Sequence, residues 1–89
     1  MPSNYVMASI AIIENDKDNL DVLQALLESQ GHTVQPFISD KSFLGALKPD
    51  LFRLILMDLS MPDMDGYELL EAVRRQDPDV PVMAVTGRD

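Results

Sequence analysis

The sequence has no cysteine, few basic residues and no long hydrophobic run. Without cysteine, the chain forms no disulfide, no thiolate metal site and no cysteine nucleophile. Its 7 Lys and Arg residues stand against 15 Asp and Glu residues, so the formal net charge is −8. Because such a charge repels nucleic-acid phosphates and anionic lipids, we expect neither nucleic acid nor a membrane as a partner.

The N-terminal region gives no signal for export or membrane insertion. No Lys or Arg precedes Glu14, and Ser9 interrupts the apolar stretch from Met7 to Ile13. Both features argue against a signal peptide and against a membrane span. We therefore expect a cytoplasmic protein.

The order of apolar segments indicates the fold class. The 89 residues fit a single domain, of which we take 1–9 to be an N-terminal extension. Beyond it, short apolar runs alternate with longer segments of helical periodicity, which is typical of an α/β protein with a parallel sheet. The predicted strands are residues 10–13, 33–37, 54–57 and 81–85.

Three helices are predicted between these strands. The first contains Leu20, Leu23 and Leu27, is capped by Asn15 or Asp16, and ends at Gly31.

The second helix is capped by Ser39 or Asp40, and the third ends at Asp77-Pro78. Pro36 lacks an N–H group, which places its strand at a sheet edge, whereas the strand 54–57 is apolar throughout and therefore central.

Polar residues follow three of the predicted strands. In an open parallel sheet, ligands bind outside the carboxyl ends of the strands, and neighbouring strands lie about 4.8 Å apart. We therefore expect these residues to converge on one ligand. Clustered carboxylates repel one another unless a cation lies between them, and oxygen ligands suit Mg²⁺. The residues are Glu14, Asn15 and Asp16 after the first strand, Asp58 after the third, and Thr86 after the fourth.

Three segments carry a resemblance to a known family. They are IAIIENDKDNL at the first strand, LILMDLSMPDMDGYELL around Asp58, and PVMAVTG at the fourth strand. The whole chain resembles the receiver domain of two-component response regulators. The resemblance implies a flavodoxin-like, doubly wound parallel sheet and a phosphoacceptor signalling domain rather than an enzyme, at most phosphorylating and dephosphorylating itself.

The resemblance also implies a role for each site residue. Asp58 would be the phosphoacceptor, taking a phosphoryl group from the phosphohistidine of a histidine kinase or phosphotransfer protein. Thr86 would bond a phosphoryl oxygen and change rotamer, and Gly87 would leave room for the group. The implied Mg²⁺ ligands are Glu14, Asn15, Asp58 and the backbone carbonyl of Ser60.

The chain departs from the family pattern in two ways. Asn15 is a neutral amide where the family has a carboxylate, so Mg²⁺ affinity should be weakened, with Asp16 as an alternative acidic ligand. Members usually run to about 120 residues, within the ordinary size of one domain. The chain is therefore interpreted as a C-terminally truncated receiver of four strands and three helices. It lacks the usual last helix–strand–helix, and with it the family's lysine and aromatic switch residue.

Several interpretations stay open on this evidence. Asp58, Ser60 and Thr86 favour a phosphoaccepting receiver, whereas Asn15 and the absent lysine favour a degenerate, phosphorylation-independent interaction module. A third interpretation is a truncated form that serves mainly as a folding unit. Since the fourth strand would be an exposed apolar edge, we also expect a homodimer or a domain-swapped assembly.

Overall fold

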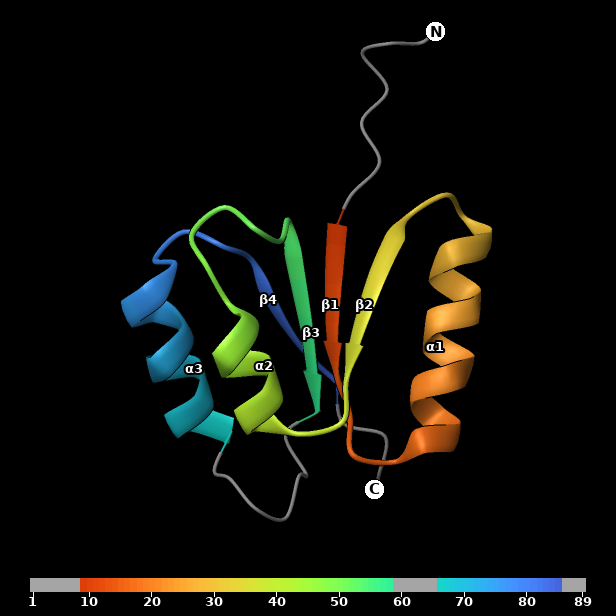
Figure 1. The fold of residues 1–89 in the computed structure, drawn as a ribbon, viewed down its shortest axis with the longest axis horizontal. Coiled ribbons are helices and arrows are strands. Elements are labelled where there is room, and N and C mark those ends of the chain that lie inside the picture. Colours follow the sequence, from red (N-terminus) through yellow and green to blue (C-terminus); the bar gives the residue numbers. More distant parts are fainter. Residues whose placement is uncertain (1–8, 59–65, 86–89) are drawn as a thin grey trace, which may run out of the picture.

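The computed structural model describes residues 9–58 and 66–85. Figure 1 shows the alternation of strands and helices that the sequence predicts. Strand β1 begins at Ser9, within the predicted extension, and the rest of that extension lies outside the described residues. The elements are β1 (Ser9–Ile13), α1 (Lys17–Ser29), β2 (Thr33–Phe37), α2 (Asp40–Ala46), β3 (Leu54–Asp58), α3 (Gly66–Gln76) and β4 (Val82–Val85).

The four strands form one parallel sheet in the order β2-β1-β3-β4. The expected incomplete doubly wound α/β fold is confirmed. Pro36 lies on the edge strand β2, as predicted from its missing N–H group. The carboxyl ends of the strands point to the same side of the molecule, at the bottom of Figure 1. The carboxyl ends of β1 and β3 therefore lie at the same end of the sheet.

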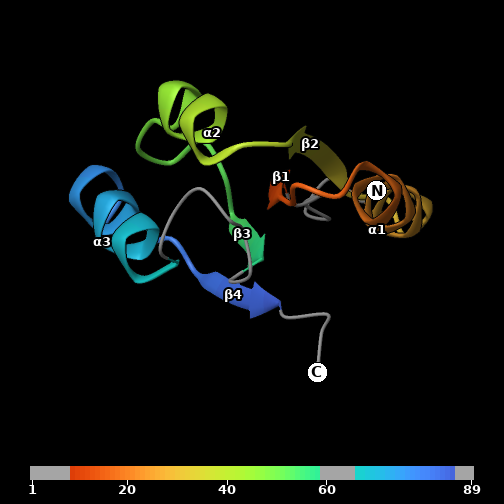
Figure 2. The same ribbon diagram turned by 90° about the horizontal axis from the view of Figure 1, so that it is seen from below.

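The helices cover opposite faces of the sheet, with α1 on one face and α2 and α3 on the other (Figure 2). Alternating side chains of the central strands supply the two layers, because successive residues of a strand point to opposite faces. Ile10 and Ile12 pack with Leu20 of α1, whereas Ala11 and Ile13 pack with the residues of α2 and α3. Among residues 9–58 and 66–85, no helix has the length and apolar character needed to cross a membrane.

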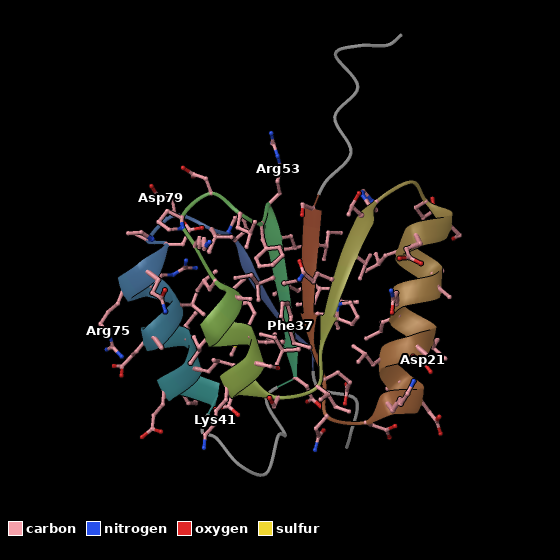
Figure 3. The ribbon with its side chains drawn as sticks, in the orientation of Figure 1. Asp21, Phe37, Lys41, Arg53, Arg75 and Asp79 are labelled. Carbon is pink, nitrogen blue, oxygen red and sulfur yellow. The ribbon has the colours of Figure 1, made fainter. Side chains whose placement is uncertain are left out.

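Three phenylalanines fill the layer beneath α2. Phe37, near the centre of Figure 3, packs edge-on against Phe43 and Phe52 at centroid distances of 5.4 and 6.1 Å. Phe43 is completely buried. This aromatic cluster packs the end of β2 against α2. The carboxyl end of β2 is therefore held by the hydrophobic core.

The helix ends follow the predicted signals. Ser39 caps α2 by accepting a hydrogen bond from the N–H of Ser42 at 3.1 Å, which decides between the two predicted caps. After α1 the chain turns at Gly31, whose φ of 94° is a conformation that glycine adopts without strain. Arg74 of α3 donates to the carbonyls of Val80 and Pro78 at 2.6 and 3.2 Å, which ties the end of α3 to the segment entering β4.

Candidate functional site

Two carboxylates lie side by side where β1 and β3 end. Ile13 and Met57 are register partners on these adjacent parallel strands, so the next residues, Glu14 and Asp58, are neighbours. Both are buried, with 6% and 9% of their surfaces exposed. They line one small hollow together with Leu23 of α1. The structure therefore brings together two of the residues that the sequence predicts to converge.

Glu14 is anchored through both its backbone and its side chain. Its N–H donates to the carbonyl of Phe37 at 3.0 Å, which joins the end of β1 to the end of β2. Its Oε2 accepts a hydrogen bond from the N–H of Asp16, also at 3.0 Å. The carboxylate is thus held by the chain that leads from β1 into α1.

The surroundings of Glu14 destabilise the ionised form of its carboxyl group. Burial raises the pKa of the Glu14 carboxyl above its ordinary value of 4.5, and this is the largest cause. The N–H of Asp16 acts in the opposite sense, while the charge of Asp58 and a hydrogen bond with its carboxyl group raise the pKa further. Two buried carboxyl groups in contact favour a shared proton or a cation between them.

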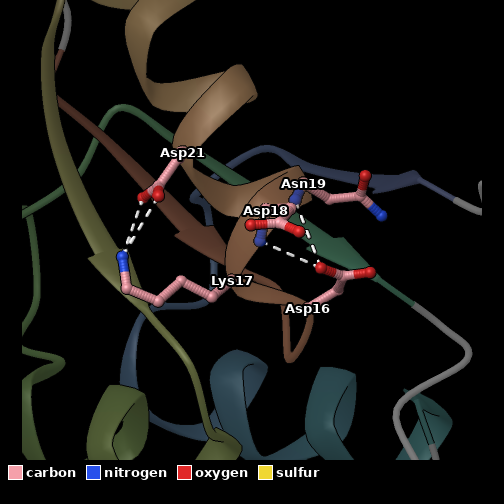
Figure 4. A network of polar contacts seen from close by, with 5 residues as sticks. All are labelled: Asp16, Lys17, Asp18, Asn19 and Asp21. Atoms are coloured by element: carbon pink, nitrogen blue, oxygen red, sulfur yellow. Dashed lines mark hydrogen bonds and ion pairs between the residues drawn. The ribbon is translucent and has the colours of Figure 1, made fainter.

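Asp16 uses its side chain to cap α1. Its Oδ1 accepts hydrogen bonds from the N–H groups of Asp18 and Asn19 at 2.9 and 3.4 Å (Figure 4). The sequence left this cap open between positions 15 and 16, and the structure assigns it to Asp16. Beside it, Lys17 and Asp21 form an exposed ion pair at 3.1 Å across the first turn. The side chain of Asn15 is exposed.

The remaining predicted site residues, Ser60, Thr86 and Gly87, lie outside the described residues. In the part of the chain that the structure describes, no three His, Cys, Asp or Glu side chains form a group able to hold a metal ion. The donor set still fits Mg²⁺, because this ion keeps several waters and takes one or two carboxylates. Glu14 and Asp58 supply two.

A second hollow, of about 500 Å³, lies at the opposite end of the sheet. Arg53 and Asp79, which line it, appear at the top of Figure 3, far from the ends of β1 and β3. The buried carboxylate of Asp77 there accepts the N–H of Asp50 at 3.2 Å. Asp50 has a φ of 65°, so this contact supports a tight turn before β3. The hydrogen bond between Asp77 and Asp50 therefore has a structural role.

Two features of the site were not anticipated from the sequence. One is the contact between the N–H of Asp16 and Glu14, and the other is Leu23 beside the two carboxylates. The spacing contained a signal for the first, because a helix cap two residues after a strand-end carboxylate places an N–H near it. From the sequence alone, Leu23 is predicted only to lie on the apolar face of its helix.

Residues 10–89 match the response regulator receiver domain family. The chain belongs to this family. One relative of the receiver is the C4-dicarboxylate transport transcriptional regulatory protein DctD of Rhizobium meliloti (strain 1021). It is 37% identical over 79 residues, a match that covers 89% of this chain and 17% of the relative. A CheY-like response regulator receiver domain protein of Methanospirillum hungatei JF-1 is 31% identical with a TM-score of 0.85, over 94% of this chain and 67% of the other.

A second similar structure contains a metal ion. It is the receiver domain of the sensor histidine kinase PA1611 of Pseudomonas aeruginosa PAO1, with magnesium coordinated in its active site cleft. This domain is 27% identical to the present receiver, with a TM-score of 0.79, over 89% of this chain and 66% of the other. The receiver thus spans about two thirds of these two solved chains and less than a fifth of the regulatory protein DctD.

Proposed function

We propose that this receiver domain accepts a phosphoryl group on Asp58 from the phosphohistidine of a histidine kinase or phosphotransfer protein. The observation that carries the proposal is the pairing of Asp58 with Glu14, both buried, at the carboxyl ends of β3 and β1. Membership of the receiver family supports it, since receiver domains act in two-component signalling. We take the chain as one domain, whose sheet begins at Ser9 rather than after it.

The transfer is a displacement at phosphorus. A carboxylate oxygen of Asp58 forms the new P–O bond, the P–N bond to the donor histidine breaks, and the imidazole nitrogen keeps the electron pair. In such a transfer the protein mainly positions groups and neutralises charge. The same site would permit slow self-phosphorylation from a small phosphodonor and self-dephosphorylation by water.

Mg²⁺ is the cation that we assign to the site. Glu14 and Asp58 would hold it with their carboxylates, Asn15 with its amide oxygen and Ser60 with its backbone carbonyl. When bound, it supplies positive charge for the phosphoryl oxygens. Because Asn15 brings no charge, the affinity should be lower than with a third carboxylate. The same proposal assigns Thr86 to a phosphoryl oxygen and Gly87 to the space around it.

Intact mass spectrometry tests the proposal. The chain is incubated with Mg²⁺ and acetyl phosphate, and a gain of one phosphoryl group is expected. The Asp58→Asn variant should show no gain, whereas Asp40→Asn, which changes a buried aspartate at the start of α2, should keep it. No gain in the unmodified chain at any donor concentration, or an equal gain in Asp58→Asn, would overturn the proposal.

A second candidate function is a phosphorylation-independent interaction module that pairs through β4. This strand lies at the edge of the described sheet. Met83 on it is 55% exposed, and Ala84 is exposed as well. An edge strand with apolar side chains is a template for pairing with another chain. This observation favours the homodimer or domain-swapped assembly that the sequence predicts.

Sedimentation at micromolar concentration tests this second candidate. A dimer is expected, and Ala84→Lys should convert it to a monomer because a charge on the edge opposes pairing. Gln35→Lys places the same charge on β2, the other edge of the sheet, and should leave the dimer intact. A monomeric chain, or equal loss of the dimer in both variants, contradicts pairing through β4.

A further inference from the structure

We propose that Asp16 is a positioning residue for the metal site. By capping α1 it directs its own N–H at Glu14 and holds that carboxylate beside Asp58. The inference rests on the proposed function, because it concerns the cation that Glu14 and Asp58 would share. It assigns to Asp16 a role distinct from that of a metal ligand.

The first step is the fixed backbone of Asp16. Its φ of −92° and ψ of 112° are extended, as is usual for the residue that caps a helix. Its Oδ1 accepts from the N–H groups of Asp18 and Asn19 at 2.9 and 3.4 Å, so the peptide at position 16 is tied to the first turn of α1 (Figure 4). The direction of its N–H therefore depends on the cap.

The second step is the contact that this N–H makes. It donates to Oε2 of Glu14 at 3.0 Å, while the N–H of Glu14 donates to Phe37. A glutamate side chain has several rotatable bonds, and fixing it costs conformational entropy. With one oxygen held by Asp16, the Glu14 carboxylate is ordered before any cation arrives. Pre-ordered ligands bind a metal more tightly, and residues that orient them contribute to affinity.

The third step separates capping from ligation. If Asp16 gave Oδ1 to a cation, the N–H groups of Asp18 and Asn19 would lose their acceptor. In this chain the carboxylate of Asp16 caps α1, and the exposed amide of Asn15 remains available as a metal ligand. The double variant Asn15→Asp and Asp16→Asn would exchange the two groups. An amide would then cap α1, and a carboxylate would be available as a metal ligand. Asn and Asp are equally good caps, so α1 should tolerate that exchange.

The experiment is a Mg²⁺ titration of the full chain followed by the amide NMR shifts of Glu14 and Asp58. Asp16→Ala removes the cap and should weaken Mg²⁺ binding about tenfold, as is typical for residues that orient a metal ligand. Asp16→Asn keeps the cap and should bind within about twofold of the unmodified chain. Ser39→Ala removes the equivalent cap of another helix, α2, and should leave the affinity unchanged.

A metal-free measurement separates this inference from the proposed function. Hydrogen exchange of the amide at position 16 should be slow in the unmodified chain and in Asp16→Asn, and fast in Asp16→Ala. Slow exchange in Asp16→Ala, or a loss of affinity in Asp16→Asn as large as in Asp16→Ala, would overturn the positioning role. Absence of any Mg²⁺ binding by the unmodified chain would instead overturn the metal site of the proposed function.

Discussion

Glu14 and Asp58 are neighbours because Ile13 and Met57 are register partners on adjacent parallel strands. The two carboxyl groups are buried at the same end of the sheet, and the charge of Asp58 contributes to the raised pKa of Glu14. Burying like charges together costs free energy unless a proton or a cation compensates. The fold therefore places two carboxyl groups in an unfavourable arrangement at the site that we propose for the cation.

The raised pKa of Glu14 predicts a pH-dependent stability in the absence of metal. Between pH 4.5, its ordinary pKa, and the higher folded-state value, the folded chain holds a proton that the unfolded chain has lost. This contribution to the free energy of unfolding is fully present below about pH 4.5 and is lost as pH rises through the folded-state pKa.

Urea unfolding across this pH range measures the effect. In Glu14→Gln the side chain does not titrate, so the decline with rising pH should be shallower than in the unmodified chain. Glu28→Gln, which changes an exposed glutamate at the other end of α1, serves as the control and should keep the original slope. Equal slopes in all three proteins would contradict the raised pKa of Glu14.

Asn15→Asp should strengthen Mg²⁺ binding, because it adds a charge to a site of oxygen ligands. Without metal, the same change should lower the free energy of unfolding, since it places a third carboxylate near Glu14 and Asp58. Isothermal titration with Mg²⁺ and metal-free urea unfolding check the two effects. Unchanged metal affinity would mean that the side chain at position 15 does not face the cation.

Two glycines offer a matched test of backbone conformation. Gly31→Ala should destabilise the chain by about 1 kcal/mol or more, because the φ of 94° at this position is strained for any residue with a Cβ. Gly45 lies inside α2, and a Cβ added there meets nothing within 4 Å. Gly45→Ala should therefore stabilise by about 0.5–1 kcal/mol. Thermal unfolding measures both, and shifts of the same sign would contradict this assignment.

The aromatic cluster under α2 should dominate the stability of that layer. Phe43 is fully buried between Phe37 and Phe52, so Phe43→Ala should cost about 3–5 kcal/mol. Val22→Ala removes apolar atoms from a side chain that is 66% exposed and should change the free energy of unfolding by less than about 0.5 kcal/mol. Denaturant midpoints of the two variants give the comparison, and similar losses would mean that the cluster is not the stabilising core.

The local features of this protein could be predicted from its sequence. Apolar runs and helical spacing placed every strand and helix, because each pattern spans only the residues of its own element. Pro36 indicated an edge strand through its missing N–H, and Gly31 indicated a helix end through its freedom at positive φ. The strand-end position of Asp58 followed from the apolar segment before it.

Only the tertiary structure decided how these pieces meet. It buried both Glu14 and Asp58, which the sequence had predicted only to converge, and it gave the cap of α1 to Asp16 rather than Asn15. Strand pairing and burial depend on residues far apart in the chain, so no local pattern contains them. Asn15 and Asp16 are adjacent, and both residue types are suitable helix caps, so the sequence did not distinguish between them. The structure assigns the cap to Asp16, whose N–H also donates a hydrogen bond to the Glu14 side chain.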